Sequence, residues 1–183
     1  DQDGDGFGDN ATGFQADDCP AEEGYSNIGL FCCPDGDNDG TAQTDDAFPD
    51  DPSQWNDTDS DGYGDNPNGT DPDACPAVVG TSTIDRFGCP DEDSDGASDA
   101  NDLWLGDDTQ WFDSDQDTYG DNEAGTMGDS CPFESGTSNQ GTKHGCPDDD
   151  GDGWANIEDA FPEEDSQWID SDGDGWGDNQ TAG

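Results

Sequence analysis

Positive charge is almost absent from this chain, which has 2 Lys and Arg residues against 50 Asp and Glu residues and a formal net charge of −48. Such an acidic surface repels phosphate, so we expect no binding to nucleic acid. Histidine occurs once, at His144, and the sequence shows no nucleophile–base pair and no phosphate-cradling loop. We therefore predict that the chain is not an enzyme. Paired carboxylates can cleave glycosides, but here they come in sets that are spaced as metal ligands.

Long apolar runs are also missing, since only 26% of the residues are hydrophobic. This excludes a large central core, and it excludes insertion into a membrane, which needs ~18 consecutive apolar residues. Charge and hydropathy alone would indicate a disordered chain, but the acids and the 17 aromatic residues recur at regular spacing. No signal peptide precedes Asp1, which already lies within a motif, so we expect a mature product or a piece of a longer array.

Aspartate triplets at alternate positions are the most regular feature that is present. Aspartate outnumbers glutamate 42 to 8, as expected where short side chains fold back onto an ion. At ~4 Å and an effective dielectric constant of about 20, each like-charged pair costs about 4 kcal/mol, so the triplets need a cation between them. Two kinds of loop carry these triplets: type A starts at Asp35, Asp91 and Asp148, and type B starts at Asp1, Asp57, Asp113 and Asp170.

The two kinds of loop alternate with a period of about 56 residues, which indicates a repeat protein. The predicted units are 1–56, 57–112 and 113–169, with the start of a fourth at 170–183. Neither helix nor strand periodicity extends through any repeat. We expect an irregular chain of turns and loops, with one helical turn before each Gln-Trp pair.

Type A loops match the twelve-residue spacing of calcium loops, with aspartate at positions 1, 3 and 5, glycine at 6, a carbonyl at 7 and oxygen donors at 9 and 12. Position 12 is aspartate rather than glutamate, and flanking amphipathic helices are absent. The predicted ligands are Asp35, Asp37, Asp39, Thr41, Gln43 and Asp46, then Asp91, Asp93, Asp95, Ala97, Asp99 and Asp102, then Asp148, Asp150, Asp152, Trp154, Asn156 and Asp159. An acid at position 17 is predicted to close each site or to begin a second one: Asp51, Asp107 and Glu164.

Type B loops keep positions 1, 3, 5 and 9 but have an aromatic residue at position 7, glycine at 8 and no acid at 12. Their predicted ligands are Asp1, Asp3, Asp5, Phe7 and Asp9, then Asp57, Asp59, Asp61, Tyr63 and Asp65, then Asp113, Asp115, Asp117, Tyr119 and Asp121, then Asp170, Asp172, Asp174, Trp176 and Asp178. We expect the missing carboxylate to come from position 17, that is from Asp17, Asp73 and Asp129. The third loop is the weakest, because Thr118 replaces glycine and would be strained in a left-handed conformation.

Six of the seven cysteines precede proline and come in pairs 14 or 15 residues apart. This regularity predicts one disulfide per repeat in an oxidising compartment: Cys19–Cys33, Cys75–Cys89 and Cys131–Cys146. Zinc needs ligands clustered in fours, which these isolated pairs do not offer. The seventh cysteine, Cys32, stands where the other repeats have glycine. It would link two chains, compete with Cys33 for Cys19, or have no role.

Taken together, the loops, the Cys-Pro elements and the Gly-Asp at the end of the type B loops resemble the thrombospondin type 3 repeat, over essentially all 183 residues. Asp91–Asp102 is similar to one motif of that family, and Asp57–Asp65 with Asp73–Pro76 is similar to the other. The resemblance implies a fold around a string of calcium ions with little regular secondary structure, each motif being able to hold more than one ion. The Gln-Trp segments and the polar stretches between paired cysteines depart from the family, and look more like prokaryotic surface-protein arrays.

From these patterns we expect an elongated, disulfide-stapled repeat rod outside the cell or on its surface, in which calcium, at least one ion per loop, replaces the hydrophobic core. Its function would be that of a rigid stalk, spacer or filament whose partners are copies of itself, end to end or side by side. The alternatives are a calcium-dependent adhesin or carbohydrate-binding module, and an acidic mineral-associated matrix protein.

Two further features bear on partners. Asn-x-Thr sequons predict N-glycosylation at Asn10, Asn56, Asn68 and Asn179. The tryptophans of the Gln-Trp pairs would pack on aromatic side chains of the neighbouring repeat or form a stripe that binds glycans: Trp55, Trp111 and Trp168.

Overall fold

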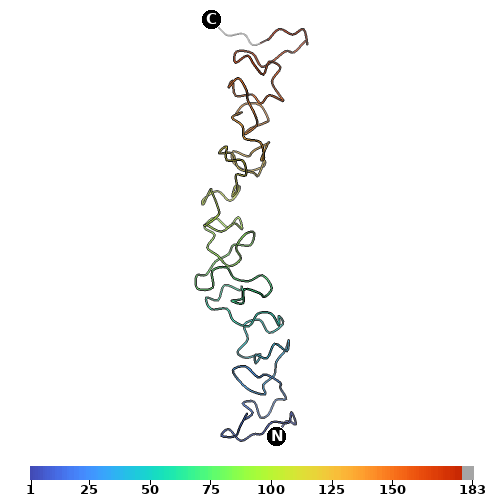
Figure 1. Cartoon of the computed structure of the whole chain (residues 1–183), viewed down its shortest axis with the longest axis vertical. Coiled ribbons are helices and arrows are strands. Elements are labelled where there is room, and N and C mark those ends of the chain that lie inside the picture. The colour runs from blue at the N-terminus through green and yellow to red at the C-terminus, as the bar shows by residue number, and fades with distance from the viewer. Residues whose placement is uncertain (179–183) are drawn as a thin grey trace. The chain divides into compact units, whose positions relative to one another are not determined.

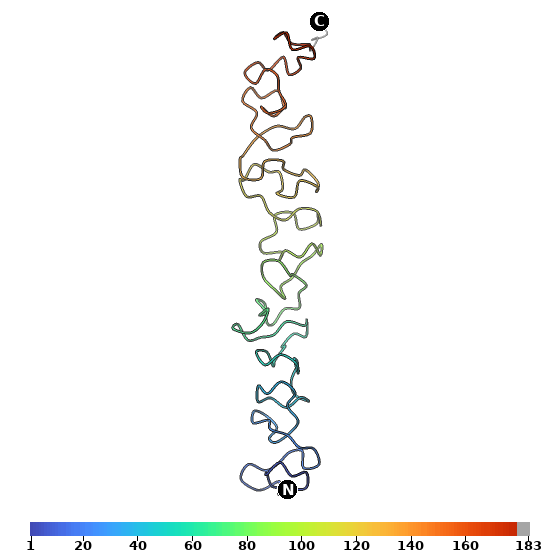
Figure 2. The ribbon, with the colours of Figure 1, turned by 90° about the vertical axis from the view of Figure 1, so that its right-hand side faces the viewer.

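The structure, a computed structural model, describes residues 1–178, and within them the chain forms no helix and no strand. The backbone runs through bends and turns instead (Figures 1 and 2). This confirms the predicted irregular fold. Isolated parallel β-bridges are the only strand-like pairings in the described part: Gly8↔Ala16, Ile28↔Thr41, Gly64↔Pro72 and Gly120↔Gly128.

The predicted helical turn before each Gln-Trp pair is wrong. In the first of these segments two reverse turns follow one another: the Phe48 carbonyl accepts from the Asp51 N–H at 2.9 Å, and the Asp51 carbonyl accepts from the Gln54 N–H at 3.0 Å. The Asp51 side chain accepts a hydrogen bond from the Ser53 N–H at 2.9 Å. Because the Ser53 N–H bonds to the Asp51 side chain rather than to a backbone carbonyl, the segment forms successive turns instead of a helix.

The chain divides into two compact units, Asp1–Asp91 and Glu92–Gly183. The first contains the type B loops at Asp1 and Asp57 and the type A loop at Asp35; the second contains the loops that begin at Asp113, Asp148 and Asp170. The type A loop at Asp91 starts on the last residue of the first unit. Within residues 1–178 we find no helix that is long and apolar enough to span a membrane.

Three disulfides close the loops that the sequence predicted: Cys19–Cys33, Cys75–Cys89 and Cys131–Cys146. These bonds fit an oxidising, extracellular environment. A buried serine braces each cysteine loop from inside. In the second loop the Ser82 hydroxyl donates to the Arg86 carbonyl and accepts from the Cys89 N–H at 2.9 Å. Ser26 and Ser138 make the same pair of bonds in the other two loops.

The buried residues are small or polar rather than aliphatic. The largest side chains that are fully buried include two glutamines, an aspartate and several cysteines and serines, while the buried apolar residues are cysteines and alanines. Leu, Ile and Val side chains are exposed at several positions. The predicted absence of a large core is therefore confirmed for the described residues. Hydrogen bonds and disulfides, rather than apolar packing, hold these segments together.

Two of the three Gln-Trp pairs bury their glutamine, Gln54 and Gln110, while Gln167 is half-buried. Gln54 is 1% exposed. Its Nε2 donates to the carbonyls of Asn66 and Thr70 at 3.1 and 3.0 Å, and its Oε1 accepts from the Asn66 N–H at 2.9 Å. Gln110 repeats all three bonds around the next type B loop, with Asn122 and Thr126. These side chains fix the exit of the loop that follows them.

The aromatic residues form small pairs rather than a continuous cluster. Trp168 stacks on Trp154 with ring centroids 6.3 Å apart. The partner of Trp168 thus lies in the same predicted repeat, not in a neighbouring one. Tyr63 of a type B loop lies against Phe87 of the following disulfide loop, with ring centroids 5.7 Å apart.

Candidate metal centres

Loops of both types wind around their first aspartate. In the loop at Asp35, the N–H groups of Asn38 and Gly40 donate to the two carboxylate oxygens of Asp35 at 2.7 and 3.0 Å. The Asp39 and Thr41 N–H groups donate to Oδ1 of Asp37 and Asp39 at 3.1 and 2.6 Å. Each aspartate therefore uses Oδ1 to accept a backbone hydrogen bond. The Oδ2 atoms at positions 3 and 5 remain available to a ligand.

The same bonds recur in the other loops because positions 4 and 6 adopt positive φ. In the loop at Asp57 the values are 70° at Ser60 and 98° at Gly62. In the loop at Asp113 they are 66° at Gln116 and 84° at Thr118. Two such residues turn successive N–H groups inward, onto the first carboxylate. Thr118 adopts the left-handed conformation that the sequence analysis identified as strained, since a β-branched residue at positive φ is an outlier.

Buried carboxylate oxygens without any hydrogen-bond partner are the feature that marks these loops as candidate metal centres. An unpaired buried charge is costly, so such oxygens imply a ligand that the protein itself does not supply. They belong to positions 3 and 5 of the loops and to position 17 of the type B loops: Oδ2 of Asp3, Asp5, Asp17, Asp37, Asp39, Asp59, Asp73, Asp93, Asp115, Asp129, Asp150 and Asp152.

The spacing of these acids suits a cation of the size of calcium. The carboxylates at positions 1, 3 and 5 offer oxygens that all lie within 4.8 Å of one another, in the triplets that start at Asp1, Asp35, Asp57 and Asp113 among others. Calcium–oxygen distances are about 2.3–2.6 Å, so two oxygens of one calcium ion lie at most about 5 Å apart. The residues present therefore fit calcium.

Two of the aspartates at position 12 of the type A loops, Asp46 and Asp159, lie close enough to their triplets for the charges to interact. Burial raises the pKa of Asp46, and the charges of Asp39, Asp37 and Asp35 add to that effect, while a hydrogen bond from the Phe48 N–H opposes it. Asp159 behaves in the same way beside Asp150 and Asp148. These carboxylates lie within the electrostatic field of their triplets, where one cation could hold all of them.

Position 17 returns to the type B centre. Asp73 is buried, and a Cβ added to Gly88 would lie 2.5 Å from Asp73 Oδ1 and 3.0 Å from Asp61 Oδ2, so both carboxylates converge on one glycine. Asp129 is 1% exposed. Burial raises the pKa of Asp129 to about 6; the Cys131 N–H opposes the shift, and the charges of Asp117, Asp115 and Asp121 add to it. That position 17 closes the site with a metal ligand stays a prediction.

Position 17 of the type A loops has different partners. Asp51 accepts hydrogen bonds from the N–H and the hydroxyl of Ser53 at 2.9 and 2.7 Å, and these bonds lower its pKa. Asp107 accepts the equivalent pair from Thr109. Glu164 accepts from the Ser166 hydroxyl at 2.9 Å. These acids cap the turn that carries the buried glutamine, a role that the sequence analysis did not identify.

Position 9 closes each loop onto its second residue. Asp65 accepts from the Thr58 N–H and hydroxyl at 3.2 and 2.6 Å. Equivalent bonds reach Asp9, Asp99, Asp121, Asn156 and Asp178 from the N–H at position 2. Gln43 lies over Gly36, the second residue of its loop. Hydrogen bonds therefore close the loops into rings.

The remaining predicted residues are placed as follows. The N–H of position 7 donates to Oδ1 of position 5, as from Tyr63 to Asp61 at 2.9 Å, and its carbonyl stays a predicted ligand. The type B loop at Asp170 keeps its backbone bonds, but its residues from Ser171 to Asp178 are exposed.

The asparagines of three predicted sequons are exposed: Asn10, Asn56 and Asn68. The fourth, Asn179, lies outside the described residues.

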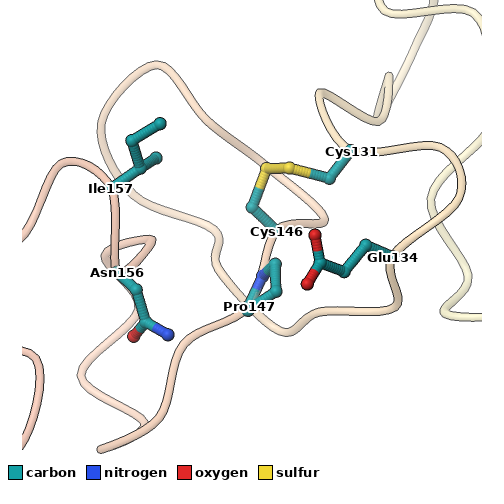
Figure 3. Close-up of a pocket in the computed structure, with 6 residues that line it drawn as sticks. All are labelled: Cys131, Glu134, Cys146, Pro147, Asn156 and Ile157. Carbon is teal, nitrogen blue, oxygen red and sulfur yellow. A yellow bond between two sulfur atoms is a disulfide. The ribbon is translucent and has the colours of Figure 1, made fainter.

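A shallow recess lies beside the third disulfide (Figure 3). Cys131, Cys146 and Pro147 line it together with Glu134, and Asn156 and Ile157 come from the type A loop that follows. Ile157 is 81% exposed. Asn156, at position 9, thus connects this recess to a candidate metal centre.

No family model matches this chain, and a search of curated proteins finds no significant relative. The interpretation of the loops therefore depends on their own geometry.

Proposed function

We propose that this chain is a calcium-binding structural protein, built as thrombospondin type 3-like repeats, which serves as a rigid extracellular stalk, spacer or filament. The buried, unpartnered carboxylate oxygens that point into successive loops support this function most directly. Calcium takes six to eight oxygen ligands in flexible geometry, whereas magnesium demands a near-ideal octahedron. Loops with many carboxylates and little regular structure therefore favour calcium.

Calcium would supply the stability that apolar packing cannot. Extracellular calcium sites typically have dissociation constants of ~0.1–1 mM. At ~10 mM calcium, each site then adds about 1.4–2.7 kcal/mol to the free energy of unfolding. The described residues have no aliphatic core, so this contribution, multiplied over the loops, would decide whether the chain is ordered. A protein whose order depends on extracellular calcium suits a load-bearing or spacing role.

Limited proteolysis of the full chain tests the proposal. We expect resistance in calcium and rapid cleavage after chelation, with the disulfides intact in both samples. Native mass spectrometry should count at least one ion per loop, and electron microscopy of the intact species in calcium should show stiff particles or filaments. Magnesium at equal concentration is the control and should protect poorly. Equal cleavage with calcium and with chelator would reject a calcium-dependent structural role.

Exposed aromatic side chains favour a second candidate, a calcium-dependent adhesin or carbohydrate-binding module. Phe14 is 94% exposed, Phe133 85% and Trp176 78%, and flat aromatic faces often contact sugars or partner proteins. A glycan titration followed by tryptophan fluorescence separates the two functions. A saturable, calcium-dependent change supports the adhesin, while a purely structural protein gives no response.

A further inference from the structure

Cys32 occupies a position that is glycine in the other two repeats. Its N–H donates to the Ser26 carbonyl at 2.9 Å, just as Gly88 donates to Ser82 and Gly145 to Ser138. The φ angles agree as well: 61° at Cys32 and 70° at both glycines. Cys32 is the free cysteine, and it is 1% exposed. A non-glycine residue held at positive φ is conformationally costly, so this one needs a reason.

The glycine positions show where a side chain at this point is directed. A Cβ at Gly88 would lie 2.5 Å from Oδ1 of Asp73, and a Cβ at Gly145 would lie 2.4 Å from Oδ1 of Asp129. Both aspartates are the closing carboxylates of their type B centres. In the first repeat the side chain exists, and the closing carboxylate is Asp17.

The type B centre at Asp1 has free oxygens that point to a ligand independently of the cysteine. Asp17 is 4% exposed, and its Oδ2 has no hydrogen-bond partner; the same holds for Oδ2 of Asp3 and Asp5. The centre at Asp57 differs at position 5, where Asp61 Oδ2 accepts from the Gly80 N–H at 3.0 Å. The centre at Asp113 makes the same bond from Gly136 to Asp117. The first centre therefore has one more available oxygen than its relatives.

The chemistry of the donors decides which cation this centre would prefer. Sulfur and carboxylate oxygen together form a donor set that zinc and cadmium accept, whereas calcium prefers oxygen alone.

We propose that Cys32 supplies a sulfur ligand to the centre formed by Asp3, Asp5 and Asp17, so that this centre prefers a zinc-like divalent cation to calcium. On binding, the thiol proton passes to solvent as the metal–sulfur bond forms. The two glycine-containing centres remain all-oxygen sites. This inference depends on the proposed function in one respect, namely that the loops bind cations.

Cadmium titration of the calcium-saturated full chain tests the inference. The free thiol is first confirmed by labelling in denaturant. We expect one equivalent of cadmium to produce the ultraviolet charge-transfer band of a cadmium–thiolate bond, with native mass spectrometry showing one cadmium ion among the calcium ions. The Cys32→Gly variant should lack the band and bind this cadmium on the order of 10–100-fold more weakly, because losing a ligand costs at least as much as losing an outer-shell partner.

The Cys32→Ser variant is the matched control, because it retains a side chain of similar size and removes only the sulfur. It should also lack the band while keeping the calcium ions of the other loops. If the wild-type chain binds calcium but shows no band, or if the band persists in Cys32→Gly, the sulfur ligand is rejected and the proposed function stands. If no loop binds any cation, the proposed function fails as well.

Discussion

Single buried glutamines hold the exits of the type B loops. Gln54 satisfies two carbonyls and one N–H of the chain between Asn66 and Thr70. Replacement of Gln54 by alanine leaves these three backbone groups without their partner. A fully buried group that loses its partner costs about 1–3 kcal/mol, but Asn66 is half-buried and Thr70 is exposed, so water can replace part of the lost bonding. We therefore expect Gln54→Ala to lower the free energy of unfolding by about 2–4 kcal/mol.

Denaturant unfolding in saturating calcium measures this loss. Gln2→Ala is the control, because Gln2 is exposed in the same unit, and it should change stability by less than about 0.5 kcal/mol. Equal stabilities for the two variants would show that the hydrogen bonds of Gln54 do not hold the loop.

Asp129 makes the ion-free protein sensitive to pH. Its pKa of about 6 lies above the unfolded value of about 3.9. The folded state therefore binds the extra proton between these values. Stability from this group is fully present below pH ~4 and is lost as the pH rises through about 6. Calcium binding should instead become tighter as the pH rises, since protons and calcium compete for the carboxylate.

In chelator the wild type should be cleaved more slowly at pH 5 than at pH 7, and Asp129→Asn should reduce this difference. The variant should also weaken calcium binding in its loop on the order of 10–100-fold. Protease resistance in chelator at pH 5 and pH 7, together with calcium titration, measures both effects. Asp108→Asn removes the same charge at an exposed site and should do neither. If Asp129→Asn binds calcium as tightly as the wild type, Asp129 is not a ligand of this centre.

The sequence singled out the buried carboxylates at position 17 but not the buried glutamines, for a physical reason. Asp73 and Asp129 stand at a constant distance from their triplets, so charge and spacing alone point to them. Gln54 carries no charge and neighbours Trp55, and in an ordinary core the aromatic residue would be the buried one. In this chain the groups that need partners are backbone N–H and C=O groups. The side-chain amide of Gln54 is therefore buried, while Trp55 is 37% exposed.

At the scale of elements, each disulfide loop packs backbone directly against backbone. A Cβ added to Gly80 would lie 2.0 Å from the carbonyl carbon of Cys89, and Gly24 and Gly136 show the same close approach to Cys33 and Cys146. The Thr81 and Ser82 N–H groups both donate to the Cys89 carbonyl, at 3.0 and 3.1 Å. No side chain fits between the two segments of this element.

Gly80→Ala should therefore destabilise the first unit by about 1–3 kcal/mol through overpacking, or by more if the backbone cannot move. Thermal unfolding in calcium provides the measurement. Gly8→Ala is the matched control in the same unit, because a Cβ there meets nothing within 4 Å. If both variants have the melting temperature of the wild type, the close approach at Gly80 does not contribute to stability.

Covalent and charge patterns made the elements predictable, whereas local hydrogen bonding did not. Equal cysteine spacing was enough to predict all three disulfides, because short loops bring their ends together readily. The turn before each Gln-Trp pair was predicted as helical. Asp51 instead accepts hydrogen bonds from the N–H and the hydroxyl of Ser53, and such local bonding cannot be inferred from charge or cysteine spacing.

At the scale of the whole molecule, the net charge of −48 sets how the chain responds to loss of ions. Each bound calcium cancels two negative charges. Without calcium, repulsion acts over a screening length of about 30 Å at 0.01 M salt but only about 3 Å at 1 M. We expect the chelated protein to expand at low salt and to contract partly in 1 M sodium chloride.

Small-angle scattering of chelated and calcium-loaded samples at both salt concentrations checks this expectation. The calcium-loaded protein serves as the control and should change little with salt. A chelated chain whose radius of gyration is insensitive to salt would show that repulsion between carboxylates does not drive the expansion.

The hydrogen bonds described above join residues at most 19 positions apart, the widest being those from Gly80 to Asp61 and from Gly136 to Asp117. Chains with such local contacts close only short loops as they fold, which keeps the entropic barrier low. If the loops bind calcium as proposed, each stretch of the chain would be able to order as soon as it reaches a calcium-rich space, without waiting for residues far along the sequence.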